Sequence, residues 1–177
     1  WLPAHVKDFP RSIAQAVGWF LEELEMLLWF TPWPAITLAI VLPALAYGGL
    51  RLAIFTLLGV TFWGMVDMWD SAMSTLALMT VSVTFSVVGG IALGVMSSQS
   101  DRFESFLKPV LDTMQTMPAF VYLIPAIFFF GIGGPSATMA IIIYAMPPSV
   151  RLTNLGIRQV PETTIEAAQS FGSTSRQ

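Results

Sequence analysis

The sequence has 177 residues, of which 55% are hydrophobic and 11% are charged. A soluble domain usually carries roughly 25% charged residues, so this chain has too little charge to cover a water-exposed surface, and a membrane protein is indicated. The net charge of -3 comes without a run of Lys or Arg, which leaves nucleic-acid binding without an electrostatic basis. With no cysteine and His5 as the single histidine, disulfides and thiolate or histidine metal sites are not expected.

Residues 1–31 are predicted to form an extracytoplasmic amphipathic N-terminal segment. Apolar residues recur with helical spacing over residues 13–30. Glu22, Glu23 and Glu25 interrupt this run, and such a cluster of carboxylates argues against a membrane span. The helix is therefore expected either to lie at the membrane surface or to pack on the rest of the protein.

Apolar blocks follow, and they predict about five transmembrane helices. The blocks cover residues 34–49, 52–66, 71–96, 110–130 and 136–150. Because a span needs roughly 17 to 25 residues, the third and fourth blocks are long enough alone, whereas the other three need their flanks. The first two blocks are assigned to residues 32–69 as two peripheral transmembrane helices.

Basic residues in alternate connections predict the orientation of the chain. They are Arg51, Arg102, Lys108, Arg151, Arg158 and Arg176. The opposite connections, residues 67–70 and 131–135, hold no Lys or Arg. The positive-inside rule places the basic side, including a loop expected at residues 97–109, in the cytoplasm and the N-terminus outside.

The third block carries small residues at a spacing of four. They are Ser82, Ser86, Gly90, Gly94 and Ser98, and we call them the small-residue ridge. A ridge of this kind lets another helix approach closely within lipid. We therefore interpret Ser86, Gly90 and Gly94 as helix-packing residues rather than as ligand-binding residues.

The fourth block combines polar residues with prolines. Pro118 and Pro125 are each expected to kink the helix, because proline removes a backbone donor. Asp112, Gln115 and Thr116 precede them at the cytoplasmic end. A bent helix with a polar end suits a wall that moves or lines a path, so these five residues are candidates for a translocation path or gate. The alternative is that Asp112 simply lies at the wet interface.

Residues 161–172 predict a short cytoplasmic helix with well-defined ends. Pro161 suits the first helical position, Glu162 suits the positive end of the helix dipole, and Gly172 suits the position just past the end. One face of this helix carries Thr164, Ala167, Ala168 and Phe171. A short helix in this place is suited to docking on another protein.

Motifs for catalysis or nucleotide binding are absent from the sequence. It contains no G-x-x-x-x-G-K-[ST], no G-x-S-x-G and no H-E-x-x-H. The glycine-rich segment 131–135 joins two apolar blocks and reads as a tight turn. No catalytic residues are therefore assigned, and the chain is not expected to be an enzyme.

The stretch Glu166-Ala167-Ala168-x-x-x-Gly172 resembles the start of the EAA motif of ABC importer permeases. In that family the motif forms the coupling helix, which sits in a groove of the cytoplasmic ATPase subunit. The resemblance implies an ATPase-coupling role for Glu166, Ala167, Ala168, Phe171 and Gly172. The family motif continues beyond Gly172, so the chain is expected to be truncated.

A closer resemblance, to permeases of glycine betaine, proline betaine and choline uptake systems, extends over about residues 69–177. It is carried by residues 112–125, 146–153, 159–161 and 166–172. The resemblance implies an all-α integral membrane protein with the helical bundle of a type I (MetI-like) ABC importer permease. Residues 70–177 would then be the N-terminal part of the permease core, including the start of the coupling helix.

The function implied by this resemblance is import of compatible solutes across the bacterial cytoplasmic membrane. The implied partners are a cytoplasmic ABC ATPase, an extracytoplasmic substrate-binding protein or domain, a second permease copy and membrane lipid. The chain itself is expected to bind no cofactor, because ATP and Mg²⁺ belong to the ATPase. A secondary transporter is one alternative, although no inverted repeat is visible. A non-transporting membrane scaffold is another, although it leaves the short cytoplasmic helix unexplained.

Overall fold

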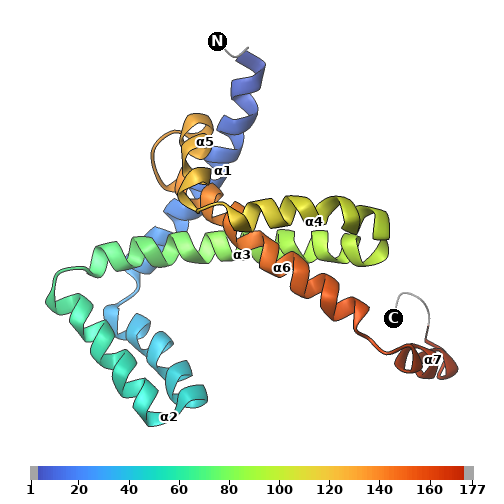
Figure 1. Ribbon diagram of the computed structural model, residues 1–177. Helices are drawn as coiled ribbons and strands as arrows, with labels where there is room; N and C mark the ends of the chain where they lie inside the picture. Colours follow the sequence, from blue (N-terminus) through green and yellow to red (C-terminus); the bar gives the residue numbers. More distant parts are fainter. Residues whose placement is uncertain (1–3, 174–177) are drawn as a thin grey trace. The chain divides into compact units, whose positions relative to one another are not determined.

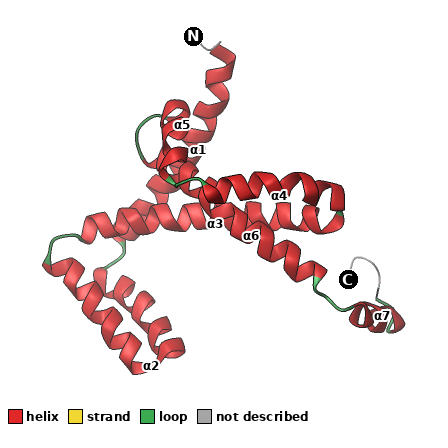
Figure 2. Cartoon of the chain, in the orientation of Figure 1, coloured by secondary structure: helices red, strands yellow, loops and turns green. Residues whose placement is uncertain are grey.

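The computed structural model describes residues 4–173, with side chains from residue 12 onward. These residues form helices joined by short loops and contain no strand (Figures 1 and 2). The helices are α1 (Ala4–Phe30), α2 (Trp33–Met65), α3 (Trp69–Gln99), α4 (Asp101–Thr116), α5 (Phe120–Phe130), α6 (Gly134–Arg158) and α7 (Glu162–Ser170). The all-α fold expected from the sequence is confirmed.

The chain divides into two compact units. The first comprises Trp1–Ser82 and Leu123–Met139, and the second comprises Val83–Tyr122 and Ala140–Gln177. Both α3 and α6 contribute to each unit, because a long helix packs against different neighbours along its length. The three segments assigned from the sequence, at residues 1–31, 32–69 and 70–177, stay a prediction.

Within the first unit, α1 packs against α3. Val17 and Leu21 of α1 are buried in one cluster with Val81 of α3. Helix α1 has 27 residues and begins at Ala4, earlier than its apolar pattern indicated. Glu22 and Glu23 remain exposed on the other side of the helix. Packing on the rest of the protein, one of the two alternatives for this segment, is thus what the structure shows.

The first two apolar blocks lie on the two arms of α2. The helix is interrupted at Gly49, which has a φ of 73°, and Figure 1 shows the two arms folded toward one another. Each arm measures about 24 Å, which is less than the roughly 30 Å hydrocarbon core of a bilayer. Glycine is needed at the bend because an L side chain is strained at this positive φ.

Length and hydropathy identify α2 and α3 as helices able to cross a membrane, and α4 with α5 adds a third if this bent pair is one span. This number covers the described residues and is lower than the expected five. The difference arises because α2 holds two of the apolar blocks. In addition, α6 carries Pro147, Pro148 and Arg151, which shorten its apolar stretch. Separate crossings by both arms of α2 and by α6 remain predictions.

The prediction of a loop at residues 97–109 is wrong, because helices occupy almost all of this segment. Helix α3 continues to Gln99, and α4 begins at Asp101. The single residue between them, Ser100, caps α4, since its hydroxyl accepts a hydrogen bond from the backbone N–H of Phe103 at 3.4 Å. Such a cap satisfies one of the free N–H groups at the helix start and allows a sharp turn.

The fourth apolar block is broken at Pro118 rather than kinked there. Met117 has φ -83° and ψ 138°, the extended conformation that steric contact with a following proline favours. Helix α4 therefore ends at Thr116, and α5 begins at Phe120. Pro125, by contrast, lies inside α5. With 11 residues, α5 is about 17 Å long, too short to cross a membrane alone.

Candidate functional site

The C-terminal helix α7 has a well-formed end. The N–H of Gly172 donates to the carbonyl of Gln169 at 2.9 Å, and the N–H of Ser173 donates to that of Ala168 at 3.1 Å. Together with the φ of 86° at Gly172, these two bonds make a Schellman motif. The left-handed glycine expected from the sequence is therefore present. Pro161 has an extended ψ of 138° and precedes the helix, one position earlier than predicted.

Every residue of α7 is exposed, and Phe171 just beyond it is 93% exposed. Isolated helices shorter than about 12 to 15 residues are marginal in water, and packing supplies most helix stability in proteins. This helix has 9 residues and buries none of them. Glu166 likewise has no ion pair within the described part of the chain. Packing within the described residues therefore contributes little to the stability of α7.

The small-residue ridge of α3 lies against α6. A Cβ atom added at Gly90 would lie 2.3 Å from the Cβ of Ser149, and one added at Gly94 would lie 2.8 Å from the carbonyl oxygen of Val150. Ser86 is buried and its hydroxyl donates to the carbonyl of Ile142 at 3.5 Å. Both helices thus approach so closely that only hydrogen fits at the two glycines.

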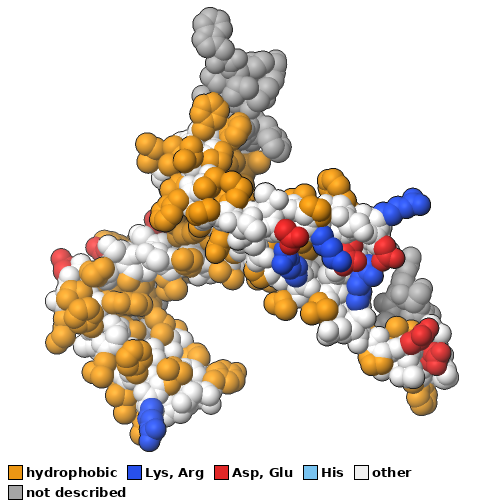
Figure 3. Space-filling view, in the orientation of Figure 1, with side chains coloured by type: hydrophobic (Ala, Val, Ile, Leu, Met, Phe, Trp, Pro, Cys, Tyr) orange, Lys and Arg blue, Asp and Glu red, His pale blue; other side chains and the backbone are white. Residues whose placement is uncertain are grey.

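Complementary charged and polar residues line the contact between α4 and α6. On α4 they are Asp101, Glu104, Lys108 and Asp112, and on α6 they are Arg151, Asn154 and Arg158. The spacing on each helix is three or four residues, so each set lies on one face. We call the two sets together the charged stripe, and Figure 3 shows acidic and basic side chains gathered over α4 and α6.

The contacts in the charged stripe pair the two helices in antiparallel order. Arg151 forms an ion pair with Asp112 at one end. In the middle, Asn154 donates to Glu104 at 3.0 Å. At the other end, Arg158 contacts Asp101 at 2.7 Å and Glu104 at 3.1 Å. Beside the stripe, Leu107, Leu111 and Val150 form a buried apolar cluster.

Arg158 connects three helices at the end of α6. Besides its two ion pairs with α4, its guanidinium donates to the carbonyl of Ser97 in α3 at 3.2 Å. Hydrogen bonding to Asp101 raises the pKa of Arg158 further above its ordinary value, and an arginine is charged at physiological pH in any case. Because α7 begins at Glu162, only four residues after Arg158, these contacts hold the end of α6 in place just before α7.

Four of the five candidate residues for a translocation path or gate lie in the same unit. Asp112, Gln115, Thr116 and Pro118 lie in the second unit, around the end of α4, whereas Pro125 belongs to the first unit. All five are exposed, and Asp112 is paired with Arg151 as described above. Both readings of Asp112, a residue of the wet interface or part of a path or gate, therefore stay predictions.

Several of these contacts were missed from the sequence. Tyr122 of α5 donates its hydroxyl to the carbonyl of Met114 at 3.0 Å and so bridges the break at Pro118. The partners of the charged stripe on α6 were also missed, although their spacing of three and four residues was a usable signal. No cluster of His, Asp or Glu that could hold a metal occurs among the residues described here.

A first prediction concerns Glu104, which meets Lys108, Asn154 and Arg158. Its side chain is 16% exposed, against 86% for Asp101, so water replaces its partners less well. We expect Glu104→Gln to lower the melting temperature of the detergent-purified protein by at least about twice as much as Asp101→Asn. Equal losses in thermal melts of the two variants would show that Glu104 does not organise the stripe.

Comparison with known proteins identifies the family. Residues 86–177, which include α4 to α7 and the second half of α3, match the family described as binding-protein-dependent transport system inner membrane component. The chain belongs to this family. It is accordingly a membrane component of a transport system, and the charged stripe, most of the small-residue ridge and α7 all lie within the matching part.

Curated relatives cover the whole chain. It is 42% identical over 179 residues to the glycine betaine transport system permease protein OpuAB of Bacillus subtilis (strain 168), covering 100% of this chain and 63% of that protein. It is 38% identical over 177 residues to the glycine betaine/proline betaine transport system permease protein ProW of Escherichia coli (strain K12), covering 100% and 50%. The match to the trimethylamine N-oxide transport system permease protein TmoV of Ruegeria pomeroyi (strain ATCC 700808 / DSM 15171 / DSS-3) is 37% over 145 residues, covering 81% and 22%. The chain spans about half the length of the first two of these relatives.

Proposed function

We propose that this chain is part of the membrane-spanning permease subunit of an ATP-driven importer of compatible solutes, such as glycine betaine, proline betaine or choline. The observation that carries the proposal is α7, a capped helix with no buried residue in a chain of this transport family. The solute class is supported by the names of relatives at 42% and 38% identity. The chain has no catalytic role of its own and binds no cofactor, because ATP and Mg²⁺ are held by a separate ATPase.

In this proposal the helix at residues 161–172 docks on the cytoplasmic ATPase. Phe171 supplies the large apolar contact, and Ala167 and Ala168 leave room for the ATPase surface to approach. Glu166 lies off that face and pairs with a basic group of the ATPase or of a neighbouring loop. The Schellman motif at Gly172 sets the direction in which the chain leaves the helix, so the docking geometry depends on it.

The charged stripe transmits movement of α7 to the membrane helices. Arg158 is joined by polar contacts to both α3 and α4, and it lies just before α7. A displacement of α7 therefore moves the ends of three helices together rather than the end of α6 alone. A second permease copy and an extracytoplasmic binding protein or domain complete the proposed assembly, and solute passes between the two permease copies.

The function is tested with the full-length protein, purified together with a cognate ATPase and reconstituted in vesicles. We expect ATP-dependent uptake of radiolabelled glycine betaine that requires an external binding protein or domain. Uptake driven by an ion gradient without ATP would favour a secondary transporter. A complex that binds the ATPase but transports none of the named solutes would favour a scaffold.

The proposed topology places the N-terminus outside and α7 in the cytoplasm of a multi-pass protein. It rests on the basic residues in alternate connections, since an Arg at a helix centre costs roughly 2.5 to 3.5 kcal/mol on insertion scales. A single cysteine introduced at Ser12 should react with an impermeant thiol reagent on intact cells, whereas one at Ser173 should react only after lysis. Labelling of the Ser173 variant but not the Ser12 variant would reverse the topology.

A further inference from the structure

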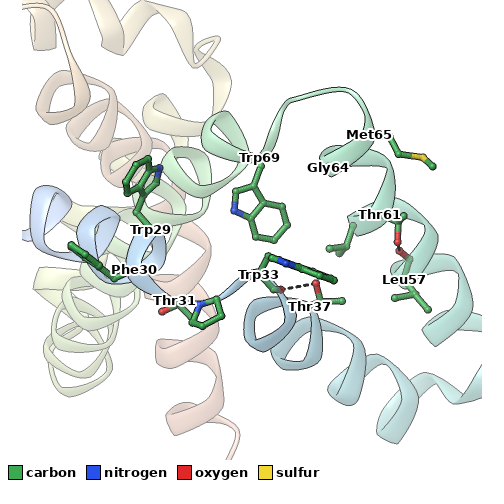
Figure 4. A pocket seen from close by; sticks show the side chains of 12 residues that line it. Trp29, Phe30, Thr31, Trp33, Thr37, Leu57, Thr61, Gly64, Met65 and Trp69 are labelled. Atoms are coloured by element: carbon green, nitrogen blue, oxygen red, sulfur yellow. Dashed lines mark hydrogen bonds between the residues drawn. The ribbon is translucent and has the colours of Figure 1, made fainter.

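An aromatic cavity lies in the first unit, where α1, α2 and α3 meet. Its volume is about 660 Å³, and its lining includes Trp29, Trp33, Trp69, Thr61 and Met65. Figure 4 shows residues of both α2 arms around it, with the indole of Trp69 pointing toward Trp33. The cavity is thus built from the end of α1, the ends of both arms of α2 and the start of α3.

Eight of the twelve residues that line the aromatic cavity are apolar, three are threonine and one is glycine. The hydroxyls of Thr31, Thr37 and Thr61 each donate to the carbonyl four residues earlier, at 2.6, 2.8 and 2.8 Å, so their protons are already used within the protein. In the described part of the chain, nothing accepts a hydrogen bond from the indole N–H of Trp33 or Trp69. The cavity therefore offers mainly ring faces and aliphatic groups, and two of its lining indoles have N–H groups without an acceptor among the described residues.

A smaller acidic hollow adjoins the aromatic cavity and shares Trp29 with it. Its volume is about 330 Å³, and its lining includes Glu22, Glu25 and Asp70. The indole of Trp29 donates to Asp70 at 3.2 Å. Among the side chains described in the first unit, Arg51 is the one basic group, and it follows the bend of α2 at the far end of arms about 24 Å long. Among the described side chains of the first unit, the carboxylates thus lack a nearby cation.

We propose that these two hollows form one binding site for a phospholipid with an ammonium headgroup. The ammonium lies beside Glu22, Glu25 and Asp70 and against the face of Trp29, where carboxylates and an indole ring both attract a cation. The phosphate accepts hydrogen bonds from Trp33 and Trp69, and an acyl chain enters between the arms of α2. Trp residues are enriched at membrane–water interfaces because their rings are amphipathic.

A lipid fits this site better than a small soluble cation does. The acidic hollow alone would suffice for a free cation, whereas the larger aromatic cavity matches an apolar chain attached to it. The arms of α2 are also shorter than the hydrocarbon core, so a bound lipid would cover apolar surface at their ends. The site goes beyond the proposed transport function and does not depend on the solute carried.

Native mass spectrometry of the full-length protein in detergent tests the proposal with defined lipids. We expect phosphatidylethanolamine to be retained about tenfold more strongly than phosphatidylglycerol. The triple variant Glu22→Gln/Glu25→Gln/Asp70→Asn should lose this preference, because amides of the same shape carry no charge. Trp33→Ala/Trp69→Ala should lower retention of both lipids, whereas Trp63→Ala, on the same helix and outside the cavity, should not.

Three other results would contradict the proposed phospholipid site. An unchanged headgroup preference in the triple amide variant would show that the carboxylates do not hold the ammonium. Equal loss of lipid from the Trp63→Ala control and the Trp33→Ala/Trp69→Ala variant would indicate general lipid contact. Full displacement of the lipid by millimolar tetramethylammonium would assign the site to a free organic cation instead.

Discussion

Replacing Gly172 with valine in the full-length protein is expected to reduce ATP-dependent solute uptake by at least about tenfold while membrane insertion stays normal. The φ of 86° at this residue is strained for any L side chain and most of all for a β-branched one. Valine would therefore disrupt the bonds from Gly172 and Ser173 that close α7. Phe171→Ala should have a comparable effect, because it removes the large apolar contact proposed for the ATPase. Uptake and solute-stimulated ATP hydrolysis are measured in reconstituted vesicles.

Ile165→Ala is the matched control for Phe171→Ala. Ile165 is also an exposed apolar residue of α7 but lies off the face that carries Phe171, so its truncation should leave uptake within about twofold of the parent. If Gly172→Val and Phe171→Ala both transport normally with an intact ATPase complex, the coupling role of α7 is wrong. An equal loss in Ile165→Ala would show that the whole helix is sensitive, rather than the proposed face.

Gly94→Leu should lower the apparent melting temperature of the detergent-purified protein by about 5 to 10 °C. A Cβ atom at this position would lie 2.5 Å from the Cβ of Thr153 and 2.8 Å from the carbonyl oxygen of Val150. The backbone carbonyl cannot rotate away as a flexible side chain can, so α3 and α6 must separate. Gly90→Leu should act similarly, since its Cβ atom would lie 2.3 Å from that of Ser149.

Gly156→Leu provides the control for the two ridge variants. Gly156 lies in α6, and a Cβ atom added there meets nothing within 4 Å. It reproduces the change in helix propensity and hydrophobicity without the steric clash, so its melting temperature should stay close to that of the parent. Thermal melts in which all three leucine variants behave alike would show that the small-residue ridge is not a close helix contact.

Local patterns were sufficient to predict several features of this protein from its sequence. The membrane character follows from the low charge and the apolar blocks. The end of α7 follows from Gly172, because glycine favours the left-handed conformation that closes a helix. The ridge follows from a spacing of four, which places Gly90 and Gly94 on one face of α3. The helix end and the ridge depend on neighbours within about two helical turns, and the membrane character depends on composition alone.

The tertiary structure decided which helix each face meets. Helical spacing shows that Asp101, Glu104 and Asp112 share a face, but it does not identify Arg151 and Arg158 as their partners. Those contacts join residues 39 and 57 positions apart for Arg151–Asp112 and Arg158–Asp101. The aromatic cavity is similar, since Trp33 and Trp69 meet only once α2 has bent at Gly49 and α3 has begun. Spacing along one helix records the period of that helix alone, whereas contacts between helices depend on how the intervening chain turns.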